Sequence, residues 1–160
     1  MIPSFRQQRS AFTLVEMVIV GAIVGLVATL ALASFAKARR MSNEKALVED
    51  LRILSGAIQT WAQNNGGMPG NGPTGGLPVG MTADDFKGVP WAAVTPLGGH
   101  WDFDSGSPCN NCGGAVTVII ATDPTDPTWK EVDALIDDGN LTTGNFRIIR
   151  SDRYSYVFEP

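Results

Sequence analysis

The chain has 160 residues, 16 acidic and 12 basic side chains, one histidine and a formal charge of −4. This acidic balance argues against a general nucleic-acid-binding surface, whose usual footprint is a basic patch. One histidine supports no Ser-His-Asp or Cys-His arrangement, and the sequence has no Walker or dinucleotide-binding glycine pattern. We therefore expect a protein that is not an enzyme and that has no cofactor.

An apolar run occupies residues 12–36, and no charged residue occurs between Met17 and Phe35. About 20 helical residues at ~1.5 Å each are enough to span the hydrocarbon core of a bilayer. One acid, Glu16, lies near the start of the run. A carboxylate inside a bilayer costs roughly 2.5–3.5 kcal/mol on insertion scales, so such a residue indicates a function. The run predicts a helix that spans a membrane or forms a filament core.

A neighbouring chain offers a partner for Glu16. Cleavage between Ala11 and Phe12 creates an α-amino group four residues before this carboxylate. A straight helix does not easily bring its own amine back onto Glu16, whereas the amine of an adjacent subunit can reach it. In an apolar bundle such a pair favours one axial register, because other registers leave two unpaired charges. We therefore expect N-terminal helices that polymerise.

The string SAFTLVE, from Ser10 to Glu16, resembles the class III signal sequence of type IV pilins and type II secretion pseudopilins. The resemblance covers about residues 1–40. It implies that a prepilin peptidase removes residues 1–11 as a basic leader. It also implies N-methylation of the new N-terminus and pairing of Glu16 with the N-terminus of a neighbouring subunit.

Carried onto this chain, the resemblance makes Ala11 the residue before the cut and Phe12 the methylated N-terminus. Two positions depart from the family pattern. Ala11 stands where the family usually has Gly, and Ala33 stands where many members have a helix-kinking Pro. Removal of Arg6 and Arg9 with the leader changes the side-chain charge from −4 to −6.

The apolar run has two other interpretations, a secretory signal peptide and a plain single-pass anchor. A secretory signal peptide has an apolar core of only 7–15 residues and an A-x-A-like cut site, which residues 31–33 supply. The run is too long for that class, and an internal Glu16 does not suit it. A plain single-pass anchor fits the length but leaves Glu16 and the FTLVE string unexplained.

The expected topology places the leader in the cytoplasm and the rest of the chain outside it. Basic residues lie on both sides of the run, but long downstream domains translocate largely regardless of charge. We expect a single-pass protein of the inner membrane that later enters a periplasmic or cell-surface filament. Its expected partners are copies of itself, other pilin-like subunits, the prepilin peptidase and an inner-membrane assembly platform, with no nucleic acid.

The helical pattern continues beyond the apolar run. Apolar residues recur at spacings of 4, 3, 4 and 3, which defines one helix face, at Leu47, Leu51, Leu54, Ile58 and Trp61. The simplest prediction is one helix over residues 12–64, apolar all round in 12–36 and amphipathic in 41–64. The amphipathic part should pack on a domain formed by residues 65–160.

The remaining elements follow in order. Residues 66–80 are too rich in Gly and Pro for regular structure, and residues 84–94 include a short helical turn broken by Pro90. A second helix should begin at Asp126-Pro127-Thr128 and end at Gly139. Strands are predicted at 100–104, 115–121, 145–150 and 154–158. The expected fold class is α+β and pilin-like, with a long helix packed on an antiparallel sheet of about four strands.

Cys109 and Cys112 form a C-x-x-C motif. In an exported domain a disulfide is their natural state, and closing so short a loop contributes about 2 kcal/mol in the chain-entropy model. Zinc would need two further ligands, and His100 is the only histidine. A structural disulfide is the favoured interpretation, with free thiols and a reactive site as alternatives.

Two pairs of acidic residues are candidate calcium ligands. Asp102 and Asp104 should face the same side of a strand, and Asp123 and Asp126 flank a loop. The resemblance to major pseudopilins, which often bind calcium in a late loop, suggests a calcium site. No loop of this chain matches that site residue by residue. We expect a solvated acidic surface and no metal.

These observations predict a structural subunit of a type IV pilus-like filament, most consistent with a pseudopilin of a type II secretion system. The small domain suits this interpretation. There are two alternatives. One is a surface or minor type IV pilin with an adhesive or DNA-uptake role, and the second is a membrane-anchored extracytoplasmic binding module.

Overall fold

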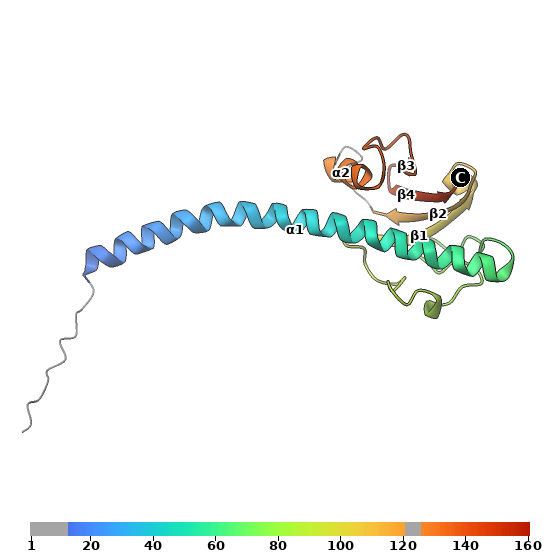
Figure 1. Ribbon diagram of the computed structural model, residues 1–160, viewed down its shortest axis with the longest axis horizontal. Helices are drawn as coiled ribbons and strands as arrows, with labels where there is room; N and C mark the ends of the chain where they lie inside the picture. Colours follow the sequence, from blue (N-terminus) through green and yellow to red (C-terminus); the bar gives the residue numbers. More distant parts are fainter. Residues whose placement is uncertain (1–12, 121–125) are drawn as a thin grey trace, which may run out of the picture. The chain divides into compact units, whose positions relative to one another are not determined.

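A computed structural model of the chain describes residues 13–120 and 126–160 (Figure 1). The chain divides into two compact units, Met1–Arg40 and Met41–Pro160. The expected leader and the cut site between Ala11 and Phe12 lie outside the described residues, as does Asp123.

Helix α1 runs from Leu14 to Asn65, close to the predicted 12–64. Thr13 precedes it, and its Oγ1 accepts a hydrogen bond from the backbone N–H of Glu16 at 3.3 Å, as an N-cap side chain does. Gly66, with φ of 77°, follows the last helical residue in the left-handed conformation that commonly ends helices. The helix therefore has a defined signal at each end.

Four strands form one antiparallel sheet in the order β1-β2-β4-β3. They are β1 (His100–Gly106), β2 (Cys112–Ile119), β3 (Phe146–Arg150) and β4 (Arg153–Glu159). The predicted α+β class and the antiparallel sheet are confirmed. β2 begins three residues earlier than predicted, because Cys112 pairs with Gly106 across an irregularity in register.

The core lies between one face of this sheet and the second part of α1. Leu47, Leu51, Leu54 and Ile58 of α1 are at most 1% exposed and belong to the same cluster as Trp101 of β1. Burying each such side chain contributes roughly 1.5–3 kcal/mol. The helical stripe read from the sequence is therefore the face that holds the domain together.

A second helix, α2 (Pro127–Ile136), packs on the same face of the sheet. Its Trp129 ring stacks on Tyr154 of β4, with centroids 3.9 Å apart. The Asp126 side chain caps it by accepting from the backbone N–H of Thr128 at 2.9 Å. The start agrees with the prediction.

The end of α2 differs from the prediction, since the last helical residue is Ile136 and not Gly139. Asp137 leaves the helical conformation, and one of its carboxylate oxygens accepts the backbone N–H groups of Asn145 and Phe146. These hydrogen bonds hold Asp137 outside the helix, which therefore ends at Ile136.

Loop residues bond to part of the backbone of each outer strand of the sheet. On the β1 side, the Asn71 side chain accepts from the backbone N–H of Ser105 at 2.8 Å and donates to its carbonyl at 3.0 Å. On the β3 side, the Asp137 carboxylate accepts a hydrogen bond from the backbone N–H of Phe146. The carbonyl of Leu141 accepts one from the backbone N–H of Ile148. These bonds satisfy groups that an unprotected edge offers to another strand.

The Gly- and Pro-rich segment 66–80 forms no helix or extended strand, as predicted, but it is fastened to the domain. Besides Asn71, the backbone N–H of Gly75 approaches Asp102 of β1, and Trp91 Nε1 donates to the carbonyl of Gly76 at 2.8 Å. The expected turn within 84–94 is a single 3-10 turn at Ala83–Asp85.

Candidate functional site

The N-terminal part of α1 exposes an unbroken apolar surface. Its large apolar side chains from Leu14 to Phe35 are 52% to 81% exposed. Among the described residues, α1 is the one helix long and apolar enough to span a membrane, by length and composition. Apolar patches beyond a few hundred Å² are rare on soluble monomers and mark interaction surfaces. This surface therefore requires lipid or other protein around it.

Glu16 is the acid at the head of this surface. It lies exposed in the first turn of α1, three residues after the capping residue Thr13. Partial positive charge at a helix N-terminus stabilises such a carboxylate by about 0.3–1 kcal/mol. That gain is smaller than the roughly 2.5–3.5 kcal/mol cost of a carboxylate in a bilayer. In a bilayer, the helix alone would therefore not compensate the charge of Glu16.

Two glycines leave the backbone open on the same segment. A Cβ atom built on Gly21 or Gly25 would meet nothing within 4 Å. Small residues on apolar helices allow neighbouring backbones to approach closely. The segment thus offers a carboxylate and two places of close approach, and Phe12, the predicted new N-terminus, lies outside the described residues.

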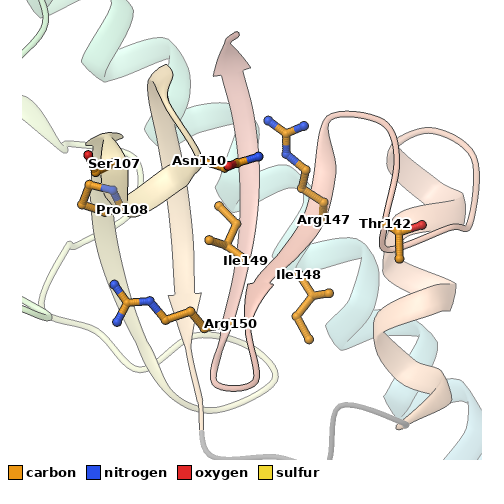
Figure 2. Close-up of a pocket in the computed structure, with 8 residues that line it drawn as sticks. All are labelled: Ser107, Pro108, Asn110, Thr142, Arg147, Ile148, Ile149 and Arg150. Atoms are coloured by element: carbon orange, nitrogen blue, oxygen red, sulfur yellow. The ribbon is translucent and has the colours of Figure 1, made fainter.

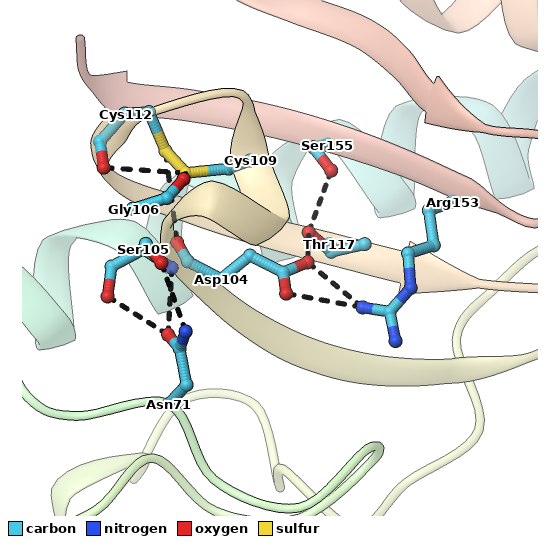
Figure 3. The surroundings of a disulfide bond; sticks show 9 residues. All are labelled: Asn71, Asp104, Ser105, Gly106, Cys109, Cys112, Thr117, Arg153 and Ser155. Atoms are coloured by element: carbon cyan, nitrogen blue, oxygen red, sulfur yellow. Dashed lines mark hydrogen bonds and ion pairs between the residues drawn. A yellow bond between two sulfur atoms is a disulfide. The ribbon is translucent and has the colours of Figure 1, made fainter.

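A disulfide joins Cys109 and Cys112, with Cα atoms 5.5 Å apart (Figure 3). It closes a turn that contains the short helix η2 (Ser107–Cys109) and two left-handed residues, Asn110 and Asn111. Both cysteines are buried and pack with Ala115 and Val157. This burial favours a structural role over a reactive thiol pair.

Asp102 and Asp104 face the same side of β1, as expected, but the expectation of a solvated acidic surface is wrong for them. They are 3% and 4% exposed and share a buried cation, Arg153 of β4. Its Nη1 lies 2.7 Å from Asp102. The same nitrogen lies 3.0 Å from Asp104, a contact drawn in Figure 3. The sequence placed Arg153 in a connecting turn, and its reach across β2 follows only from the strand order.

A hydroxyl pair completes this network on the face of the sheet opposite the core. Thr117 of β2 donates to Asp104 at 2.8 Å and lies 2.7 Å from the hydroxyl of Ser155 (Figure 3). Burial raises the pKa of Asp102, and the charge of Asp104 adds to this effect while Arg153 opposes it. Two carboxylates thus depend on one guanidinium.

A second acidic cluster, which was not predicted from the sequence, lies at the end of α2. Carboxylate oxygens of Asp133, Asp137 and Asp138 all lie within 4.8 Å of one another. Asp133 is fully buried, and neither of its oxygens has a hydrogen-bond donor. The signal that was available is the spacing of Asp133 and Asp137, one helical turn apart.

Such a cluster needs a proton or a cation to relieve repulsion. Burial, reinforced by Asp137 and Asp138, raises the pKa of Asp133 to about 7. Burial of Asp137 opposes its ionisation, but the neighbouring carboxyl of Asp133 and the backbone N–H groups of Asp138, Asn145 and Phe146 lower its pKa. A proton on Asp133, shared with Asp137, would relieve the repulsion, and so would a cation bound by the three carboxylates.

Comparison of the chain with protein-family models, with curated proteins and with solved structures finds no match. The functional argument therefore rests on the residues described above.

Proposed function

We propose that this protein is a structural subunit of a type IV pilus-like filament, of the pseudopilin kind, that polymerises through its N-terminal helix. The observation that carries the proposal is the exposed apolar segment from Leu14 to Phe35 with Glu16 in its first turn. Each copy inserts the segment into the membrane first and then exchanges lipid for the helices of its neighbours.

Energetics favour exchange over permanent anchoring. A single helix in lipid leaves Glu16 without a cation, whereas a bundle supplies the α-amino group of an adjacent copy after cleavage between Ala11 and Phe12. The pair removes two unpaired charges at once and does so in one register only. Apolar side chains around the segment pack equally well on lipid or on other helices, so the charge pair supplies the directionality.

The remainder of the chain is the part displayed by the filament. Residues 41–160 carry the four-stranded sheet and the disulfide between Cys109 and Cys112, which persists in an oxidising compartment. This chemistry supports an extracytoplasmic location for the domain, with the leader in the cytoplasm.

The test replaces Glu16 by Gln and by Leu in the full chain expressed with its assembly machinery. Both variants should reach the membrane fraction at least as well as wild type, because a buried charge is removed. Both should give at least tenfold less sheared filament, because the pair that sets the register is lost. Filament recovery and membrane abundance are measured on the same cells.

Thr29→Val is the matched control, since Thr29 is exposed on the same segment and its hydroxyl bonds only to the carbonyl of Leu26 in its own helix, at 2.8 Å. This variant should assemble normally. Normal assembly of Glu16→Gln and Glu16→Leu would contradict the charge-pair mechanism and favour a membrane-anchored binding module.

A further inference from the structure

A polar pocket lies on the domain between the disulfide turn and the outer strand β3 (Figure 2). Its volume is about 380 Å³, within the range of small-molecule sites. Two arginines, Arg147 and Arg150, line it from β3, and Figure 2 shows them on either side of Ile149. Ser107 and Asn110 line it from the disulfide turn.

Neither arginine has an acidic partner among the described residues. Within residues 13–120 and 126–160, the side chains of Arg147 and Arg150 form no hydrogen bond or ion pair, although the chain has more acids than bases. Arg147 Nε is moreover buried without an acceptor. The outer guanidinium nitrogens of both arginines are likewise bonded to no described residue. The contrast is Arg153, whose guanidinium is held by Asp102 and Asp104.

The opposite rim of the pocket is held in place covalently. The disulfide fixes the turn that carries Ser107 and Asn110, and the backbone N–H of Asn111 closes the turn on Gly106 at 2.8 Å. On the β3 side, an irregularity in register between Ile148 and Arg150 breaks the regular alternation of side chains. A rim fixed before binding lowers the entropic cost of holding a ligand.

We propose that this pocket binds an oxyanion, a carboxylate or a phosphate, carried on a ligand of up to monosaccharide size. Guanidinium groups present planar forks that match such oxyanions, often through two parallel hydrogen bonds. The hydroxyl of Ser107 and the amide of Asn110 supply further donors at the other rim. The volume exceeds that of a bare anion, which leaves room for the group that carries it.

The experiment titrates the full chain, in neutral detergent at constant ionic strength, with inorganic phosphate and with galacturonate by calorimetry. Galactose, which has the same ring without the carboxylate, is the ligand control. Wild type should show saturable binding of galacturonate, phosphate or both, and no binding of galactose. Binding of both anions identifies a general oxyanion site, and binding of galacturonate alone identifies a sugar-acid site.

Arg147→Gln should weaken binding at least tenfold, and Arg150→Gln, which changes an exposed side chain, provides the same test if Arg147→Gln does not fold. Arg52→Gln makes the same change of charge on an exposed part of α1 outside the pocket and should bind as wild type does. Absence of saturable binding, equal binding of galactose, or equal loss in Arg52→Gln would overturn the proposal.

Discussion

Asp133 is a single residue with a measurable effect on stability. Its pKa rises from 3.8 to about 7 on folding, through burial and the charges of Asp137 and Asp138. Between these two values the folded protein holds a proton that the unfolded chain has released. The free energy of unfolding contributed by this group therefore falls as pH rises from about 4 to about 7, and it is constant above that range.

Asp133→Asn should remove this fall. At pH 8 the variant should be more stable than wild type by about 2 kcal/mol, which is less than the full shift implies because Asp137 and Asp138 are exposed to water. At pH 4 the two proteins should unfold alike in urea. Asp84→Asn, at an exposed site, is the control and should keep the wild-type slope.

The same measurement distinguishes a proton from a cation. If added calcium raises the unfolding midpoint of wild type but not of Asp133→Asn, the cluster holds a metal ion and the proton assignment is wrong. If calcium has no effect and the pH slope disappears in the variant, the shared proton is correct.

Arg153 has the opposite role, because it compensates two buried carboxylates. Arg153→Met should lower the free energy of unfolding at pH 7 by about 3 kcal/mol, since Asp102 and Asp104 lose their common cation. The loss should shrink as pH falls toward 4, because burial raises the pKa of Asp102 and its carboxyl takes up a proton there. Urea unfolding at both pH values measures this.

Arg150→Met is the matched control for that prediction, because Arg150 is exposed and makes no ion pair with a described residue. It should change stability by less than about 0.5 kcal/mol. Adding Asp104→Asn to Arg153→Met should restore part of the loss. Equal stability of the two arginine variants would show that the buried network contributes nothing.

Among the elements, the disulfide turn between β1 and β2 gives the clearest test of location. In exported protein, alkylation under denaturing conditions without reductant should label neither Cys109 nor Cys112. Replacing both by Ser should lower the free energy of unfolding by about 2 kcal/mol, because a short closed loop is released in the unfolded chain. Ready labelling of unreduced protein would show free thiols and remove the support that the disulfide gives to export.

The elements were largely predictable from sequence because each follows a local pattern. The stripe from Leu47 to Ile58 fixed the helix face, and alternation fixed the strands, within a few residues at their ends. The end of α2 was misplaced because Asp137 bonds to backbone groups eight and nine residues later. Such a bond depends on how the loop folds and has no local signature.

The candidate sites divide in the same way. Glu16 is visible in the sequence because a charge interrupts an apolar run. Arg153 and its two aspartates were missed as a group, because their contact depends on β4 lying next to β2 rather than on spacing along the chain. The Arg147 pocket was missed for the same reason, since the disulfide turn and β3 meet only in the folded domain.

For the whole molecule, the decisive prediction concerns processing. Protein isolated from its native host should begin at Phe12 with an N-methyl group, as the SAFTLVE string implies. Intact mass and N-terminal sequencing test both features. A mature chain that begins at Ser34 would contradict the filament proposal and support a secreted protein released by signal peptidase.

The loop bonds to the outer strands of the sheet have a consequence for crowding. A subunit of the proposed filament would wait in the membrane beside many copies of itself, at local concentrations that favour pairing between exposed strands. Here the Asn71 side chain is hydrogen-bonded to the backbone of Ser105 in β1. Asp137 and Leu141 accept hydrogen bonds from backbone N–H groups of β3. Under the filament proposal, these bonds leave less free backbone for sheet pairing between domains, so growth would depend on the helices, where it can be reversed without unfolding a domain.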